Sequence, residues 1–247
     1  LACGTWEVLV APTEDLPARQ PLVEANMSLV PYPGLPSHAV LSQSPNGAQL
    51  LLWASALLQR PVAELSQVLA TLGDSPGDVM AIPHFSGAIS PWRQGRLSRG
   101  AFLGLTMATT PAAMVRALLE AAALDLALAV ETLRDGGTRI DVLRASGGGT
   151  RNRWWMQLKA DLTAAPVQVA GTVEAGALGA AILAGLAAGV YNGLPDACSA
   201  TSRTEATYEP QQDGKARYAA RLAAHKTAVL ALIDLYKTLR SSCVDDL

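Results

Sequence analysis

Cysteine is scarce in this chain, and its scarcity excludes two classes of small protein. The 247 residues include three cysteines, Cys3, Cys198 and Cys243, which are far apart, odd in number and form no C-x-x-C pair. That spacing fits neither a disulfide framework nor a structural zinc site. Half of the residues are apolar, so a core can form without such cross-links, and we expect a cytoplasmic protein.

Long apolar runs and an excess of one charge are also lacking. The net charge is −2 and the basic residues are scattered, which argues against nucleic-acid binding. The longest apolar run, 175–190, is shorter than the roughly 18 residues of a membrane-spanning helix. Because alanine and glycine dominate it, we expect a closely packed, buried helix and no membrane partner. The chain begins at Leu1 without a secretory signal, inside an expected strand, so we also expect a natural beginning upstream.

Several familiar catalytic motifs are missing. The sequence has no G-x-x-x-x-G-K-[ST] phosphate loop, no G-x-G-x-x-G after a strand, no G-x-S-x-G elbow and no H-E-x-x-H pair. These absences exclude the enzymes that depend on those motifs. Any nucleotide site must therefore be built from other glycine-rich turns.

The most informative segment is the glycine run at 147–149. A short apolar run, 140–145, leads into it, and a helix-forming segment, 150–164, follows. Glycine takes positive φ and lets a phosphate or an adenine ring approach the main chain, while the first amides of a helix attract anions. The run predicts a nucleotide site, and the alternative is a tight strand-to-helix turn with nothing bound.

Two further segments carry candidate binding groups. The Gly4-Thr5 turn offers backbone amides and a hydroxyl that suit a phosphate oxygen, although alone it predicts no more than a hairpin turn. The block 83–106 contains His84 and Arg99. No second metal ligand lies at a suitable spacing from His84, so we expect a hydrogen-bonding histidine, and for Arg99 we expect a structural salt bridge.

The order of the expected elements predicts an α/β fold, with a mixed sheet flanked by helices. Strands are expected at 5–10, 39–42, 79–83, 140–145 and 167–169, and helices at 48–58, 62–72, 111–134, 150–164, 174–189 and 213–240. The first strands form an antiparallel meander, the later alternation requires a parallel part, and the last helix packs outside. Trp154 and Trp155 would point about 100° apart on a helix, so one of them is expected in the core.

Four separated blocks, taken in order, resemble the C-terminal domain of the FGGY carbohydrate kinases, which include the glycerol, xylulose, ribulose, rhamnulose and fuculose kinases. The blocks are Cys3–Glu7, Pro83–Trp92 with Ser98–Thr106, Ser146–Asp161 and Glu174–Gly185. The first block is more similar to the deoxy-sugar and pentulose branches than to glycerol kinase. The resemblance implies the actin-like, ribonuclease H-like ATPase fold, with residues 1–247 as the single ATP-binding domain of a two-domain enzyme.

The resemblance also implies an ATP site. Its members would be Gly4 and Thr5 at the terminal phosphates, Gly87 in the cleft near Arg99, Gly148 and Gly149 at the nucleotide, and Asn152 beside the adenine. Gln157 and Asp161 would stabilise their helix, and the helix at 174–185 would pack beneath the adenosine pocket.

The departure from the family pattern concerns catalysis. Family members carry an Asp-x-Gly-Thr motif in an N-terminal domain and an aspartate base shortly before the Gly-Thr turn, and neither is present here. Phosphoryl transfer requires positioning, metal charge and an oriented hydroxyl. We therefore expect no catalytic residue and no metal ligand in this chain, and weak nucleotide binding with little or no transfer by the chain alone.

The resemblance implies ATP and Mg²⁺ as cofactors, and a ketose, deoxy-sugar or polyol as substrate. The missing N-terminal kinase domain would be the principal partner, and a homodimer is compatible with the resemblance. The alternative function is an actin-like nucleotide-binding regulatory module without catalysis.

Overall fold

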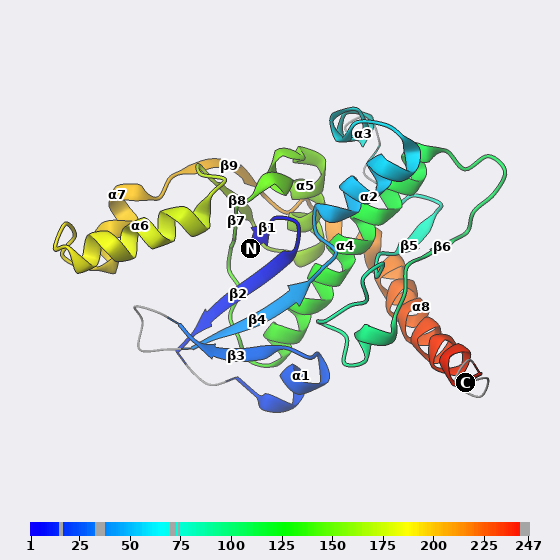
Figure 1. Ribbon diagram of the computed structural model, residues 1–247, viewed down its shortest axis with the longest axis horizontal. Coiled ribbons are helices and arrows are strands. Elements are labelled where there is room, and N and C mark those ends of the chain that lie inside the picture. The colour runs from blue at the N-terminus through cyan, green and yellow to red at the C-terminus, as the bar shows by residue number, and fades with distance from the viewer. Residues whose placement is uncertain (15–16, 33–37, 70–72, 74, 243–247) are drawn as a thin grey trace.

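The computed structural model describes residues 1–14, 17–32, 38–69, 73 and 75–242. It shows a mixed α/β fold in which the chain runs from a central N-terminus to a long C-terminal helix (Figure 1). Residues 70–72, the expected end of the second helix, and Cys243 lie outside the described residues. Within the described ranges, no helix is long and apolar enough to cross a membrane.

An antiparallel sheet forms the N-terminal part. Its strands are β1 (Ala2–Cys3), β2 (Glu7–Thr13), β3 (Ser28–Pro31) and β4 (His38–Ser44), in the order β1-β2-β4-β3. The expected antiparallel pairing is confirmed for β2 and β4, but the sheet is not the expected meander, because β3, which lies between them in the sequence, pairs at the far side of β4. Neither β3 nor the short helix α1 (Arg19–Glu24) was anticipated. Along β2, Glu7, Leu9 and Ala11 are buried on one face, as a sheet with one covered face requires.

Helix α4 (Pro111–Asp135) is the centre of the core. Pro111 occupies its first turn, where a missing N–H costs nothing, and Thr110 caps it by accepting from the Ala113 amide. The sheet, α2 (Gln49–Leu58), α3 (Val62–Leu69) and the antiparallel pair β5 (Met80–Ile82) and β6 (Ala101–Leu103) surround it. Figure 1 shows α4 running behind β2 and β4.

A second sheet lies beside the first. It consists of β7 (Leu143–Ala145), β8 (Val167–Ala170) and β9 (Thr204–Tyr208), with β7 and β8 parallel and β9 antiparallel. Helix α5 (Arg153–Thr163) makes the crossover that parallel strands require. Ala2 of β1 forms a parallel bridge with Ser146, directly after β7. That bridge brings the start of the chain to the glycine run.

The alanine- and glycine-rich helix departs from the sequence-based expectation. Helix α6 (Ala175–Ala187) packs on α7 (Leu194–Thr201), and the two project from the body as an arm (Figure 1). Within α6 only Ile182 is buried. The expectation of a closely packed, buried helix is therefore wrong for the described residues, while the place of this helix beneath the adenosine pocket stays a prediction. An all-round apolar composition shows that a helix needs cover, but not which polypeptide supplies it.

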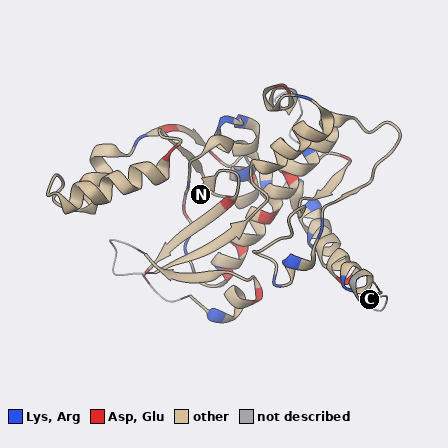
Figure 2. Ribbon diagram, in the orientation of Figure 1, with Lys and Arg blue, Asp and Glu red and all other residues tan. Residues whose placement is uncertain are grey.

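The C-terminal helix α8 (Gly214–Ser242) lies on the outside of the body, as expected, and packs against α4, α5 and β5. Its buried side chains are Tyr218, His225, Val229 and Ile233. Figure 2 shows acidic and basic residues interspersed over the body, whereas the α6 ribbon is uncharged. The scatter of basic residues expected from the sequence thus persists in the fold.

Candidate functional site

The turn at 4–6 and the glycine run lie in backbone contact. The Cys3 amide donates to the Ser146 carbonyl at 2.6 Å. A Cβ atom on Gly147 would lie 2.7 Å from the Cys3 carbonyl oxygen, and one on Gly149 would lie 2.9 Å from the same atom. Side chains are not accommodated at such distances, so the absence of a Cβ is what allows the two segments to meet.

The turn presents its amides away from the protein body. The Gly4 carbonyl accepts from the Ala48 amide at 2.9 Å, and the Thr5 carbonyl accepts from the Gln49 amide at 3.4 Å, both at the start of α2. A trans peptide points its N–H opposite its C=O, so the Thr5 and Trp6 amides point away from α2. Both residues are exposed. The turn therefore offers two amides and a hydroxyl to an anion.

The three glycines of the run differ from one another. Only Gly147 has positive φ, at +103°. A Cβ on Gly148 would have no heavy atom within 4 Å, so this position faces open space. Gly149 is buried, and its Cβ would lie 3.2 Å from the Trp155 ring. The run thus combines one strained position, one open position and one packing position.

Asn152 separates the glycine run from helix α5. A 3₁₀ turn, Gly148–Arg151, follows Gly147, and α5 begins at Arg153. The expected helix start at residue 150 is therefore wrong, because the Asn152 Oδ1 caps α5 by accepting from the Trp155 amide at 3.0 Å. The other amide atom, Nδ2, is buried and has no partner among the described residues. Such a group costs free energy unless a ligand or a water molecule satisfies it.

Gly87 lies in a segment other than the turn at 4–6 and the glycine run. It has φ of +79° and lies in the loop between β5 and β6, against the backbone of Arg96. This loop is fastened to α2 by Phe85, which stacks on Trp53 with ring centroids 4.1 Å apart. None of the contacts described above joins Gly87 to the turn at 4–6 or to the glycine run, so its place in the site rests on the resemblance.

Among the residues that the structure describes, Arg99 has no salt-bridge partner, in contrast to the expectation. Its guanidinium donates to the backbone carbonyls of Arg96 and Ser98, both at 2.9 Å. The side chain therefore braces its own loop, since carbonyl groups next to it satisfy its donors.

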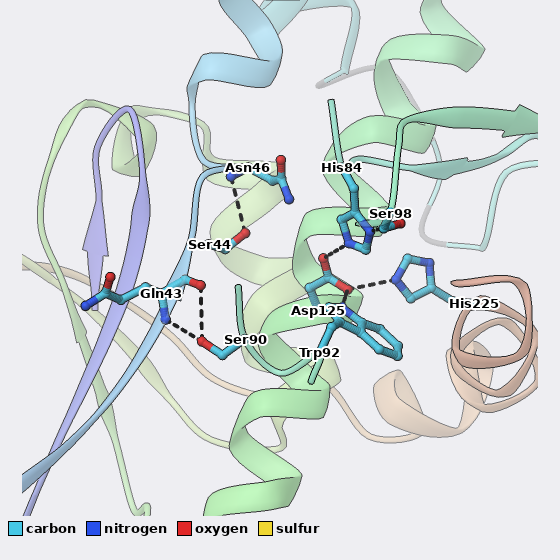
Figure 3. Close-up of polar contacts among 9 residues, drawn as sticks. All are labelled: Gln43, Ser44, Asn46, His84, Ser90, Trp92, Ser98, Asp125 and His225. Atoms are coloured by element: carbon cyan, nitrogen blue, oxygen red, sulfur yellow. Dashed lines mark hydrogen bonds and ion pairs between the residues drawn. The ribbon is translucent and has the colours of Figure 1, made fainter. Parts of the chain in front are cut away.

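Buried Asp125 of α4 anchors the loop that carries Gly87 (Figure 3). Its carboxylate lies 3.1 Å from His84 Nε2 and 2.9 Å from His225 Nε2, and it accepts from Trp92 Nε1 at 3.0 Å. Burial opposes ionisation, but the two histidines hold the pKa of Asp125 well below its usual range. His84 also bonds Ser98 at 2.7 Å. The expectation of a hydrogen-bonding histidine is confirmed.

The same loop is fastened to β4. Ser90 Oγ accepts from the Gln43 amide at 2.6 Å, and the Ser90 amide donates to the Gln43 carbonyl at 3.1 Å (Figure 3). The loop between β5 and β6 is thus held by β4 through Ser90 and by α4 through Asp125.

Three residues of helix α5, Trp155, Gln157 and Asp161, have roles predicted from the sequence. Trp155 is completely buried, as one of the two tryptophans was expected to be. Gln157 donates to Asp161 at 2.9 Å and to the Glu209 carbonyl at 2.8 Å, and Asp161 accepts from the Gln211 amide. Gln157 and Asp161 therefore stabilise the helix and its junction with α8, as expected.

The sequence predicts no metal ligand in this chain. In the part of the chain that the structure describes, no three His, Cys, Asp or Glu side chains gather as metal ligands. The described residues therefore form no all-protein metal cage, and we assign no metal ligand to this chain.

Sequence reasoning missed three residues of the site. A Cβ on Gly47 would lie 2.7 Å from the Gly4 carbonyl oxygen, so Gly47 is needed for α2 to approach the turn. Its signal was the Pro-Asn-Gly sequence before an apolar helix. Glu7 and Lys159 form a buried ion pair beneath the turn. Their signal was a carboxylate in the inward register of β2, which requires a buried partner.

Comparison with known families extends the resemblance over most of the chain. The profile described as "FGGY family of carbohydrate kinases, C-terminal domain" matches residues 1–188. The glycerol kinase of Myxococcus xanthus (strain DK1622) is 37% identical over 156 residues, which cover 62% of this chain and 31% of that protein. The glycerol kinase of Solidesulfovibrio magneticus (strain ATCC 700980 / DSM 13731 / RS-1) is 41% identical over 130 residues, 52% of this chain and 26% of that protein.

Solved structures match over nearly the whole chain. A xylulose kinase from Brucella ovis superimposes with a TM-score of 0.83 and 26% identity, covering 95% of this chain and 48% of that one. A glycerol kinase from Plasmodium falciparum, solved with ADP, gives a TM-score of 0.78 and 26% identity, covering 94% and 46%. The chain therefore spans about half the length of these solved relatives.

Proposed function

Because this chain belongs to the FGGY family of carbohydrate kinases, we propose that it is the nucleotide-binding half of a kinase that transfers the γ-phosphate of Mg-ATP to a hydroxyl group of a sugar or polyol. The actin-like ATPase fold expected from the sequence is confirmed, since the chain superimposes on solved sugar kinases. The observation that carries the proposal is the backbone contact between the turn at 4–6 and the glycine run at 147–149.

The groups at this contact suit a nucleotide. The Thr5 and Trp6 amides and the Thr5 hydroxyl are donors for phosphate oxygens. Gly148 leaves open space, and the buried Nδ2 of Asn152 is a donor without a protein partner among the described residues. The ADP in the solved Plasmodium falciparum relative supports the same class of ligand. Gly87 and Gly149 remain predicted nucleotide contacts.

Catalysis would be divided between two polypeptide regions. ATP, when bound, supplies the phosphoryl group, and the residues of this chain hold and orient its phosphates. No base is assigned within this chain, and the Mg²⁺ ion would be held by the nucleotide and by the other half. The proposal therefore predicts that the chain alone binds nucleotide weakly and transfers little.

The substrate is proposed only as a class: a ketose, a deoxy-sugar or a polyol. The curated relatives described above are glycerol kinases, whereas the solved relatives include xylulose and gluconate kinases. Glycerol therefore belongs in the substrate screen beside the ketopentoses and deoxyhexuloses.

We further propose that the missing half covers helix α6. This helix carries no charged residue, and Leu183 is 52% exposed. A Cβ on Gly176 or Gly179 would meet no heavy atom within 4 Å. An exposed apolar stretch of this kind indicates an interface, and the solved relatives carry about as much chain again as this one.

The experiment joins this chain to its natural N-terminal half and measures ADP release with glycerol, ketopentoses and deoxyhexuloses. We expect substrate-dependent release by the joined protein and none above background by this chain alone. Nucleotide binding without substrate-dependent release by the joined protein would favour the regulatory module instead.

A further inference from the structure

The turn that presents the Thr5 and Trp6 amides is closed by the strand pair of Cys3 and Glu7. These two residues lie opposite each other in the β1-β2 ladder, and both are buried. Side chains of a directly opposed pair project from the same face of a sheet. On that face, Lys159 of α5 contacts both: its Nζ donates to the Glu7 carboxylate and lies 3.7 Å from Cys3 Sγ.

Lys159 also contacts Trp155, which packs against the glycine run. Its Nζ lies 3.7 Å from the centroid of the Trp155 ring, a cation–π distance. That ring packs against Gly149, and its Nε1 donates to the Leu119 carbonyl of α4 at 2.9 Å. One ammonium group therefore touches the base of the turn directly and the glycine run through Trp155.

Burial and pairing shift the pKa values of Lys159 and Cys3. Burial alone lowers the pKa of Lys159, but the pairing with the Glu7 carboxylate opposes burial, and that pKa lies above its usual value. Burial raises the pKa of the Cys3 thiol, so Cys3 is a neutral contact and not a reactive thiolate. The cluster consists of one cation and one anion, both removed from solvent.

Stability alone gives little reason for such a pair. Replacing a buried ion pair by apolar side chains of similar volume is often neutral or stabilising. Glu7 occupies the same inward register of β2 as Leu9 and Ala11, where an apolar side chain would pack. What the pair does supply is directional hydrogen bonding at one point, the base of the turn.

We propose that Lys159, paired with Glu7, is a positioning residue for the phosphate end of the nucleotide. It fixes the turn at 4–6 relative to the glycine run at 147–149, acting through Cys3 and Trp155 without touching the ligand. This inference rests on the proposed nucleotide site, because the turn is the segment assigned to the phosphates.

The test uses a charge-free pair in the full chain. The double variant Glu7→Leu/Lys159→Met removes both charges and leaves no unpaired ion. Its matched control, Arg116→Met/Glu120→Leu, removes another buried ion pair, whose atoms are 2.7 Å apart on α4 and whose partners include Tyr218.

Two readouts separate positioning from packing. The first is hydrogen exchange at the Cys3 and Ala48 amides, whose hydrogen bonds fasten the turn to Ser146 and to α2. The second is the affinity for ADP against that for adenosine, measured by titration. In the Glu7→Leu/Lys159→Met variant we expect exchange at both amides to rise at least tenfold and ADP affinity to fall about tenfold, with adenosine affinity unchanged. The control should leave all three unchanged.

Unchanged exchange at Cys3 and Ala48 in the charge-free variant would overturn the proposal, whatever the nucleotide result. Failure of the wild-type chain to bind ADP would instead remove the proposed function, and the exchange data would still decide whether Lys159 positions the turn. If the double variant does not fold, Glu7→Gln decides the question. It keeps the shape and an acceptor for Lys159, and we expect the same changes to a smaller degree.

Discussion

Gly147 and Cys3 are in backbone contact, since a Cβ atom on Gly147 would lie 2.7 Å from the Cys3 carbonyl oxygen. The φ of Gly147 is +103°, a region that L side chains rarely adopt. This junction is also the place where β1 meets the second sheet. Its geometry therefore controls whether the two walls of the candidate site come together.

Gly147→Ala should destabilise the fold by about 1–3 kcal/mol, through backbone strain and the clash with Cys3. Gly137→Ala is the matched control, because Gly137 has φ of +91° with nothing within 4 Å of its Cβ position. Urea unfolding gives the loss of stability in each variant, and the difference between the two losses measures the cost of the clash with Cys3. Equal losses in the two variants would show that the contact with Cys3 is not restrictive.

Gly148→Val should weaken nucleotide binding at least tenfold while changing the free energy of unfolding by less than about 0.5 kcal/mol. The reason is that a side chain here meets no protein atom and instead fills the space assigned to the ligand. NMR titration with ADP measures the affinity. Gly176→Val, at an open position on α6, serves as control, and unchanged affinity in Gly148→Val would remove the glycine run from the site.

Asn152 allows its two roles to be separated. Asn152→Ser keeps an oxygen that can cap α5 but removes the unpartnered Nδ2 donor, whereas Asn152→Ala removes both. We expect both variants to lose ADP affinity, and only the alanine variant to lose about 1 kcal/mol of stability. A serine variant with wild-type affinity would show that Nδ2 does not meet the nucleotide.

Local signals in the sequence were sufficient for most helices. Pro111 predicts the start of α4 because a first-turn proline acts within a few residues. The start of α5 was placed too early, at residue 150, although Asn152 is itself a strong capping residue. The 3₁₀ turn between β7 and α5 lies against Cys3 at Gly149, and sequence spacing does not report such a tertiary contact.

The sequence did not predict which segments and side chains contact one another in the fold. Composition predicted that α6 is buried, yet in the part of the chain that the structure describes only Ile182 of this helix is buried. The motifs placed Gly4 and Gly148 in one site, but not the buried link between Glu7 and Lys159. These two residues lie in separate blocks far apart along the chain, and a motif does not report which of its side chains pair inside the fold. Gly149 was expected to meet the nucleotide, and the structure gives it a packing contact with Trp155.

Asp125→Asn should destabilise the protein by about 3–5 kcal/mol at pH 7, because it removes the charge that His84 and His225 share. The folded-state pKa of Asp125 lies below its usual value, so its contribution is complete above about pH 4. Below that pH the difference between wild type and variant should shrink by about 1.4 kcal/mol per pH unit.

Denaturant unfolding between pH 7 and pH 3 measures this dependence. Asp141→Asn is the control, since Asp141 pairs with Arg139 on the surface with 62% of its side chain exposed, and exposed pairs contribute little. A gap between wild type and Asp125→Asn that does not change with pH would contradict the assigned ionisation.

Ala180→Glu tests the proposed cover of α6. Ala180 is exposed on that helix, so the charge should leave the unfolding of this chain unchanged and prevent association with the N-terminal half. Ala220→Glu places the same charge on exposed α8 and should permit association. Analytical ultracentrifugation of mixtures distinguishes the two, and normal association of Ala180→Glu would exclude α6 from the interface.

The central claim, that the turn at 4–6 and the glycine run form one nucleotide site, is tested most directly by a two-dimensional NMR titration of this chain with ADP. We predict saturable shifts of the Thr5, Trp6 and Gly148 amides, with a common dissociation constant and no shift at Gly137. Shifts confined to one of the two segments, or absent from both at saturating ADP, would contradict the account.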